Sequence, residues 1–250
     1  IKKQIKLIYH RNLYVFFKTN NNENIYITVL DEMNIARIEY YFAEFLSLLE
    51  LPNLESRNLD VITDVWDNDP KLLNNGQLRL SKNMWFIGTA NNDDSTFAIS
   101  DKVYDRAMVI NLDTKAEPFE APKTPPVKIS CEYLERIMET AKKDYTISRR
   151  NLNRIKKLDT YMIANFHLTF GNRIMKQIKT YVPVFVACGG DELEAIDDIF
   201  SRKVMRKLEA QNPVYVRNAS EGLCNYLDEV FGIDKMPLCK EYILRIARNA

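Results

Sequence analysis

Two adjacent carboxylates stand between an apolar run and an amphipathic segment, and this order constrains the fold more than any other feature of the chain. Residues 25 to 30 are mostly apolar and β-branched, a pattern typical of a parallel strand buried on both faces. Asp31 and Glu32 follow at once. Apolar residues then recur at helical spacing until Pro52, which predicts a helix packed on the sheet. We therefore expect an α/β protein with the pair at the carboxyl end of a strand, where open sheets bind ligands.

Carboxylates in that position suit phosphoryl transfer. One can hold Mg²⁺, and a second can orient or polarise the attacking water. The alternative is structural: Asp31 and Glu32 could cap the following helix and complement its dipole, which stabilises a helix by about 0.5–2 kcal/mol. The pair alone does not choose between these interpretations.

A second region repeats the pattern of an apolar run with a polar tip. Residues 84 to 87 are apolar, residues 89 to 95 form a polar turn, and residues 107 to 112 are a third apolar run. Together with the first run, they predict three short buried strands in a parallel sheet, with their polar tips at one edge.

Three blocks in this order resemble the AAA+ ATPases, and among them the McrB-type branch, the nucleotide-driven subunits of modification-dependent restriction systems. They are residues 29 to 50, 85 to 96 and 101 to 112, which read VLDEMNIARIEYYFAEFLSLLE, WFIGTANNDDST and DKVYDRAMVINL. The resemblance implies the later part of an AAA+ P-loop NTPase core, a parallel sheet with flanking helices, followed by an all-helical lid domain.

The resemblance also implies roles for single residues. Asp31 resembles the Walker B carboxylate that binds Mg²⁺, Glu32 the catalytic glutamate, and Asn34 the asparagine that often follows this pair at the nucleotide site. Asn91 resembles sensor 1, an amide that hydrogen-bonds the γ-phosphate and the lytic water; alternatively, its side chain serves a turn. Arg106 resembles an arginine finger donated across a subunit interface; alternatively, it is a solvated arginine at a helix end.

The phosphate loop of the family is missing. None of the seven glycines belongs to a G-x-x-x-x-G-K-[ST] motif, and without that nest of N–H groups a triphosphate loses its main anchor. Because the chain begins at Ile1, we expect the loop upstream in a longer polypeptide; a naturally degenerate ATPase is the alternative. The arginine that McrB-type GTPases carry after the sensor 1 asparagine is also missing, which favours ATP over GTP.

A proline-rich stretch divides the chain. Four prolines fall within residues 115 to 129 and favour an extended connector. We therefore expect an α/β core portion at 1–114, a linker at 115–129 and a helical lid at 130–250. Capping signals in the lid predict helices that start after Ser130, Ser148 and Asp191 (with Glu194), a helix over residues 220–231, and a last helix from about Leu238.

Several arginines in the lid are candidates for contact with the nucleotide. Arg173, after a predicted cap at Asn172, resembles the sensor 2 arginine of AAA+ lids; Arg149 and Arg150 are the runners-up, and an ordinary surface arginine is the alternative. Four other basic residues are interpreted as a solvated helix face rather than a track for DNA: Arg202, Lys203, Arg206 and Lys207.

The segment at 51–83 is longer than an ordinary connection. Asn74, Asn75 and Gly76 favour a hairpin turn within it. Insertions before the sensor 1 strand often line the central pore in AAA+ rings, so Trp66 is a candidate contact for a translocated substrate, or alternatively an anchor for the loop.

Composition adds few constraints. A net charge of +1 creates no field that favours nucleic acid or membrane, and no apolar run reaches 18 residues. His10 and His167 are isolated, so no histidine-based metal or nucleophile site is predicted. The four cysteines lack C-x-x-C spacing and are expected to be reduced thiols of a cytosolic protein: Cys131, Cys188, Cys224 and Cys239.

The resemblance thus implies a cytoplasmic NTPase that hydrolyses ATP or GTP with Mg²⁺ in a homo-oligomeric, hexamer-like ring. It further implies a McrC-like nuclease partner in defence against foreign DNA, which would be contacted indirectly or through pore loops, and no membrane. The competing interpretation is a catalytically inactive scaffold or adaptor whose AAA+ fold serves only oligomerisation. A phosphate loop upstream of Ile1 would select the motor.

Overall fold

The structure is a computed structural model that describes residues 23–51, 53–60, 75–91, 93, 95–112 and 117–249. The chain is mixed α/β and divides into two compact units: Ile1–Met108 with Lys115–Leu134, and Val109–Thr114 with Glu135–Ala250. The described strands all fall in the first unit. The residues directly after Met108, expected to belong to the core portion, are grouped with the helical unit.

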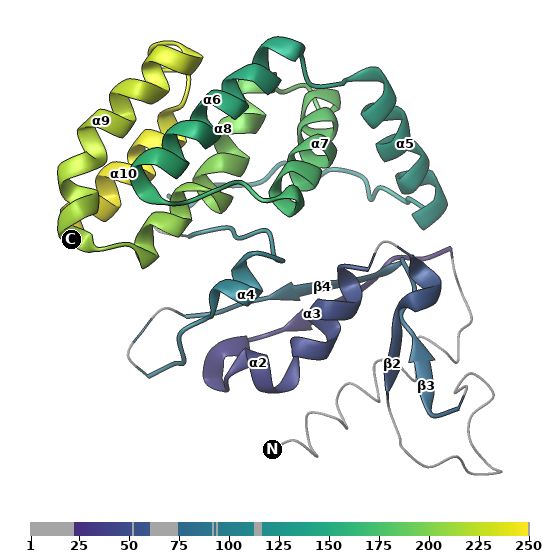
Figure 1. The fold of residues 1–250 in the computed structure, drawn as a ribbon. Coiled ribbons are helices and arrows are strands. Elements are labelled where there is room, and N and C mark those ends of the chain that lie inside the picture. Colours follow the sequence, from purple (N-terminus) through teal and green to yellow (C-terminus); the bar gives the residue numbers. More distant parts are fainter. Residues whose placement is uncertain are drawn as a thin grey trace. The chain divides into compact units, whose positions relative to one another are not determined.

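The first unit is built on two parallel strands, β1 (Tyr26–Leu30) and β4 (Met84–Gly88). Tyr26 lies opposite Met84 and Leu30 opposite Gly88, and the two strands lie side by side in Figure 1. Because the strands are parallel and in this register, the chain leaves both of them at the same edge of the sheet. The predicted strands at these two positions are confirmed.

Two short helices, α2 (Ile38–Tyr41) and α3 (Ala43–Leu49), cover one face of this sheet. They replace the single helix expected there, because Phe42 adopts φ −115° and ψ −3° and interrupts it. The rings of Phe42 and Phe45 stack with their centroids 5.3 Å apart, and both meet Phe86 of β4 edge-on. These aromatic contacts form the centre of the core of this unit.

The opposite face of the sheet is exposed. Ile27 and Val29 of β1 are 55% and 60% exposed, and Trp85 and Ile87, their partners in β4, are 42% and 49% exposed. We call these four residues the sheet stripe. The expectation that the first strand is buried on both faces is therefore wrong, because the described helices of this unit pack on one side only.

The prediction of a third strand, at residues 107 to 112, is also wrong. These residues have no regular secondary structure, and Ile110 and Leu112 are 72% and 90% exposed. A strand exists only with a partner, and the pairings among the described strands are β1 with β4 and β2 with β3. An apolar run alone was thus insufficient to make a strand here.

A second, antiparallel pair joins β2 (Asn58–Asp60) to β3 (Gln77–Arg79), with Asp60 opposite Gln77. Asn75 and Gly76 have positive φ values of 50° and 75° and form a turn directly before β3. The predicted turn is therefore present. It does not join the two strands by itself, because the connection between them runs from Asp60 to Gln77. Trp66 lies outside the described residues, as do residues 52 and 61–74 of the predicted pore-facing segment and His10.

Residues 117–129, within the predicted linker, are exposed and have no regular structure. A short helix, α4 (Asp101–Tyr104), precedes it in the first unit. Among the described helices, none combines the length and the apolar character needed to cross a membrane. None of the four cysteines, which all lie in the described part of the chain, forms a disulfide.

The helical unit contains most of α5 (Cys131–Asp144), whose first four residues are grouped with the first unit, and five further described helices. These are α6 (Arg149–Phe166), α7 (Asn172–Ala187), α8 (Glu192–Lys203), α9 (Pro213–Phe231) and α10 (Pro237–Asn249). The predicted caps at Ser130, Ser148 and Asp191 are confirmed, the last with a full capping box to Glu194. The helix expected at 220–231 begins earlier, because Asn212 caps it and Pro213 starts it.

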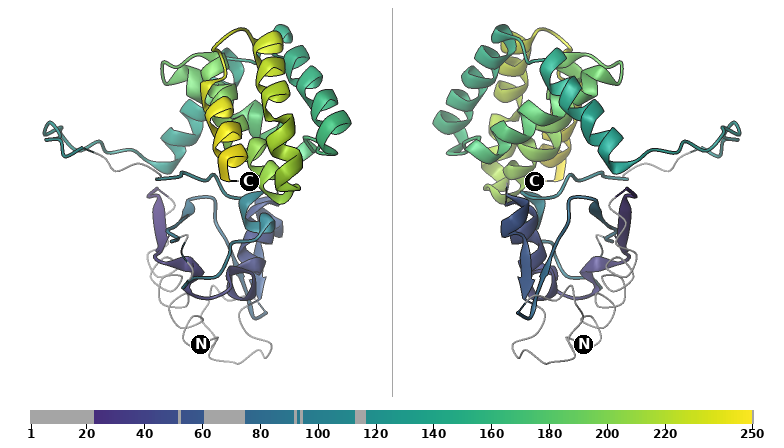
Figure 2. Two further views of the ribbon diagram at one scale, coloured as in Figure 1. Left: turned by 90° about the vertical axis from the view of Figure 1, so that its left-hand side faces the viewer. Right: turned by 90° about the vertical axis from the view of Figure 1, so that its right-hand side faces the viewer.

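Helix α8 lies at the centre of this unit. Its residues are buried over most of its length, and it packs against α7 and α10, while α9 and α10 lie next to each other (Figure 2). Lys203 on α8 is only 4% exposed and Arg202 is half-buried. The interpretation of this basic cluster as a solvated face is therefore wrong for α8, which has packing partners on several sides.

Candidate functional site

Asp31 and Glu32 lie in the exposed turn that directly follows β1. Glu32 has φ 49° and ψ 47°, the left-handed conformation, which is uncommon for a residue other than glycine. Its carboxylate makes no hydrogen bond or ion pair with the part of the chain that the structure describes. Strained backbone that presents an unpaired polar group is found more often at functional sites than elsewhere.

Thr89, directly after β4, fastens this turn to the neighbouring strand. Its hydroxyl donates to Oδ1 of Asp31 at 2.6 Å and accepts the backbone N–H of Glu32 at 2.8 Å. Its backbone N–H donates to the carbonyl of Leu30, and its carbonyl accepts the N–H of Met33. Nothing in the local sequence marks Thr89, because these partners are nearly sixty positions away; the parallel register is what brings them together.

Gly88 makes room for the same turn. A Cβ atom at this position would lie 2.3 Å from the sulfur of Met33, far inside van der Waals contact. Met33 therefore occupies the space that a side chain at position 88 would need. Because Gly88 has no side chain, the chain after Glu32 can approach the end of β4.

Asn34 is buried, with 3% of its surface exposed. Its amide group donates to the carbonyl oxygens of Asn91 at 2.7 Å and Phe97 at 3.1 Å, and its side-chain oxygen accepts the N–H of Asn91 at 3.3 Å. The structure therefore brings Asn34 together with Asn91. These contacts hold the loop after β4 in place.

Asn91 keeps its side chain available. Its backbone is bonded to Asn34 and Thr96, whereas its side-chain amide makes no hydrogen bond within the described residues. The side-chain contact that shapes this turn comes from Asp93, whose carboxylate accepts the N–H and the hydroxyl of Ser95. Within the described residues, the Asn91 side chain thus makes no turn-forming bond, and its role as sensor 1 stays a prediction.

The capping alternative for the carboxylate pair also fails. Glu32 occupies the N-cap position of the 3-10 turn at Met33–Ile35 without a side-chain bond to it, and the N-cap of α2 is Arg37, again without a side-chain bond. Asp31 bonds to Thr89 instead. Neither carboxylate therefore satisfies the N–H groups at the start of a helix.

Arg106 makes its contacts away from the carboxylate pair. Its Nε lies 2.9 Å from Oε2 of Glu50, at the end of α3, and its Nη1 donates to the carbonyl of Lys102. The side chain is 21% exposed. The side chain is thus paired and partly exposed, and a role as an arginine finger, which stays a prediction, would require this ion pair to open.

The sensor 2 candidates belong to the helical unit. Arg173 is the second residue of α7 and is exposed, but the N-cap is Gly171, and Asn172 is already helical. Arg149 and Arg150 are the first two residues of α6 and are also exposed. Their proposed contact with a nucleotide stays a prediction.

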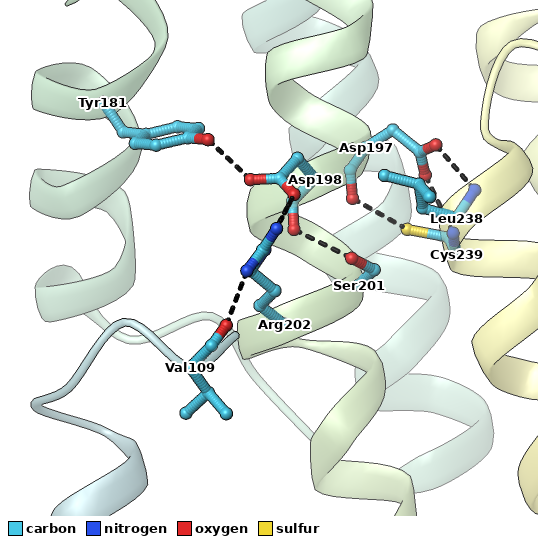
Figure 3. Close-up of polar contacts among 8 residues, drawn as sticks. All are labelled: Val109, Tyr181, Asp197, Asp198, Ser201, Arg202, Leu238 and Cys239. Atoms are coloured by element: carbon cyan, nitrogen blue, oxygen red, sulfur yellow. Dashed lines mark hydrogen bonds and ion pairs between the residues drawn. The ribbon is translucent and has the colours of Figure 1, made fainter. Parts of the chain in front are cut away.

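A second polar cluster, in the helical unit, is structural (Figure 3). Asp198 of α8 accepts the hydroxyl of Tyr181 at 2.5 Å and pairs with Arg202 at 2.6 Å. Arg202 also donates to the carbonyl of Val109 at 2.7 Å, which ties the chain after Met108 to this unit. Burial and the bond to Asp198 raise the pKa of Tyr181 well above its usual value. The groups satisfy one another, so the cluster holds elements together.

Asp197, the neighbour of Asp198 on α8, caps another helix (Figure 3). Its carboxylate accepts the backbone N–H groups of Leu238 and Cys239, at the start of α10, at 2.8 and 2.9 Å. The residue is 1% exposed, and this burial raises the pKa of its carboxyl group, although the hydrogen bonds from Cys239 and Leu238 act in the opposite direction.

The first unit therefore presents a carboxylate pair and a free amide at one edge of a parallel sheet. The donor set at this edge fits Mg²⁺: Asp31 has a second carboxylate oxygen without a partner among the described residues, and Mg²⁺ typically takes one or two carboxylates plus waters and substrate phosphates. No group of three or more metal-ligating side chains occurs among the described residues, so a cage made by protein alone is not formed there.

Comparison of the chain with protein-family models, with curated proteins and with solved structures found no match.

Proposed function

We propose that the sheet edge of the first unit is the metal-holding and water-polarising half of a nucleoside-triphosphate hydrolysis site of the AAA+ type. The observation that carries this proposal is the position of Asp31, Glu32 and Asn91 in the turns that follow β1 and β4, two parallel strands whose following segments are joined by hydrogen bonds. The side chains of Glu32 and Asn91 have no partner in the described chain, although both lie in turns that are fixed by hydrogen bonds.

The chemistry divides among these three residues. Asp31, held through one oxygen by Thr89, offers the other to Mg²⁺, which when bound neutralises charge on the transferring phosphoryl group. Glu32 is placed to polarise water, and a carboxylate with no competing partner is suited to that task. Asn91 can donate to a phosphate oxygen and accept from water at once, because a side-chain amide carries both kinds of group.

The resemblance to McrB-type proteins extends the proposal to the whole assembly. In it, the chain is part of a motor NTPase that works as a cytoplasmic ring and is coupled to a McrC-like nuclease in defence against foreign DNA. Arg106 then serves the nucleotide of the neighbouring subunit, and Arg173 contacts the nucleotide from the lid. The phosphate-anchoring loop comes from a segment that is not among these 250 residues.

A scaffold is the second candidate. It is favoured by one observation: no G-x-x-x-x-G-K-[ST] motif occurs in the chain, and an AAA+ fold without this loop can still mediate oligomerisation. In that case the residues at the sheet edge would bind neither nucleotide nor metal.

Substitution of the two carboxylates in the full-length protein, as encoded by its gene, separates the candidates. We expect Glu32→Gln to lower ATP or GTP hydrolysis by about 10²-fold or more, the scale of a general base, while nucleotide stays bound. Asp31→Asn should instead weaken the Mg²⁺-dependent binding of nucleotide, because the amide is a poorer ligand for a hard cation.

Phosphate release and calorimetric nucleotide binding measure the two effects. Glu55→Gln is the matched control, since it removes an exposed glutamate of the same unit that is remote in sequence from both strand ends. Absence of any hydrolysis by the wild-type protein would select the scaffold. Wild-type turnover in Glu32→Gln would show that Glu32 does not polarise water.

A further inference from the structure

Thr89 makes four hydrogen bonds to the segment from Leu30 to Met33, two through its backbone and two through its hydroxyl. The backbone bonds, to Leu30 and Met33, would form with any residue at this position. The hydroxyl bonds are specific to the side chain, and they reach the two residues to which the proposed chemistry is assigned.

The direction of these two bonds is fixed by chemistry. The N–H of Glu32 can only donate, so the hydroxyl oxygen accepts it. The single hydroxyl proton is then donated to Oδ1 of Asp31, which accepts it as a carboxylate. The hydroxyl thus orients one carboxylate oxygen and, through the N–H bond, supports the left-handed backbone at Glu32.

We propose that Thr89 is a positioning residue for nucleotide hydrolysis, which sets the carboxylate of Asp31 for the metal ion and the backbone of Glu32 for the attacking water. This inference rests on the proposed function. Thr89 does not itself need to touch the nucleotide or the metal, and it acts only through these two residues.

The exposure of the site separates this role from a purely structural one. Asp31, Glu32 and Thr89 are all exposed, so water can satisfy the N–H of Glu32 and the carboxylate of Asp31 when the hydroxyl is lost. Removal of the hydroxyl should therefore change stability little. Its effect should appear in the Mg²⁺ dependence of the reaction, because groups that orient metal ligands typically change metal affinity or activity by about 10- to 100-fold.

The test compares Thr89→Val, which keeps the shape of the side chain without its hydroxyl, with Thr89→Ser, which keeps the hydroxyl. Both are made in the full-length protein. Thr160→Val in α6 is the matched control, because among the described residues the Thr160 hydroxyl bonds only to the carbonyl of Lys156 in its own helix. Three quantities are measured: the Mg²⁺ concentration at half-maximal hydrolysis, the Mg²⁺ dependence of ATP binding in a Glu32→Gln background, and hydrogen exchange of the segment at 30–34.

We expect Thr89→Val to raise both Mg²⁺ midpoints by about 10-fold or more and to speed exchange in the segment at 30–34. Thr89→Ser should keep the Mg²⁺ midpoints and the exchange rate close to those of the wild type, and so should Thr160→Val. Unchanged midpoints in Thr89→Val, or a Thr89→Ser protein that behaves like Thr89→Val, would overturn the inference.

The proposed function fails by a different result, which is wild-type hydrolysis in Glu32→Gln. Since that result is measured in a variant with an intact Thr89, the two failures are distinguishable.

Discussion

At the residue scale, Glu32 has two properties that are each unfavourable for the stability of the fold. Its backbone is left-handed, a conformation that costs a residue with a side chain about 1–2 kcal/mol, and its carboxylate finds no partner in the described chain. A residue selected only for stability would be glycine or asparagine. The structure therefore places a destabilising choice at the position where the proposed reaction needs a carboxylate.

This conflict can be measured with two substitutions at the same position. Both Glu32→Gly and Glu32→Ala remove the carboxylate, but only glycine adopts the left-handed conformation without steric cost. We expect Glu32→Gly to be more stable than Glu32→Ala by about 1 kcal/mol, measured as the free energy of unfolding in urea. Equal stabilities would mean that Glu32 is not held in this conformation in solution.

The sequence predicted that Asp31, Glu32 and Asn91 follow two parallel strands, but not the contacts that hold their turns. Asp31, Glu32 and Asn91 follow apolar runs, and that order is visible without a structure. Thr89 and Gly88 could not be singled out, because their contacts depend on the register of β1 against β4. Register is set by the packing of the whole sheet, and a local pattern contains little information about it.

Elements whose ends are fixed by short-range hydrogen bonds were predicted best. Ser148 and Asp191 start α6 and α8 because each side chain bonds to an N–H two or three positions away. Residues 107 to 112 show the opposite case: their apolar pattern matches that of β1, yet they form no strand. A helix can form its bonds within itself, whereas a strand depends on a partner that the local pattern does not specify.

Asp197 gives a prediction at the scale of two helices. It lies on α8 and caps α10, and burial raises the pKa of its carboxyl group. Between the ordinary aspartate pKa of about 3.9 and the raised value, the folded state holds a proton that the unfolded state has released. The free energy of unfolding should therefore fall as the pH rises through this interval.

Asp197→Asn removes this dependence because asparagine does not titrate there. It is less stable than the wild type near neutral pH, by about 1–3 kcal/mol, since its amide can accept only one of the two N–H groups at the start of α10. Urea unfolding of both proteins across the acid range tests this, and we expect the gap between them to narrow as the pH rises from 4. A gap that widens would show that the hydrogen bonds from Leu238 and Cys239 lower the pKa of Asp197 by more than burial raises it.

At the scale of the whole molecule, the ion pair between Arg106 and Glu50 bears on assembly. If Arg106 serves a neighbouring subunit, its guanidinium must leave Glu50 and bind the phosphates of the nucleotide in that subunit. Such an exchange is reasonable for a partly exposed pair, because pairs of this kind contribute only about 0–1 kcal/mol.

Mixed rings test whether Arg106 acts between subunits. Arg106→Ala should lower turnover on the order of 10³-fold, the scale of arginine fingers. Rings that combine Arg106→Ala subunits with Glu32→Gln subunits should regain part of the activity, because some interfaces then join an intact Glu32 to an intact Arg106. The measurement is phosphate release from verified mixed rings.

The control mixes Glu32→Gln subunits with the double variant Glu32→Gln/Arg106→Ala, in which no interface has an intact pair. Recovery in the test rings but not in the control rings would support action across an interface. Absence of recovery would place Arg106 in the site of its own subunit or outside catalysis.

The sheet stripe also affects how the chain behaves at high concentration. Ile27, Val29, Trp85 and Ile87 present apolar side chains on a two-stranded sheet whose outer backbone edges lack a strand partner among the described residues, and surfaces of this kind promote aggregation. Little charge opposes it, since the net charge is +1 and the isoelectric point is about 7.8. Precipitation should therefore be strongest in sulfate-rich buffers near neutral pH, where apolar attraction is strengthened and electrostatic repulsion is weakest.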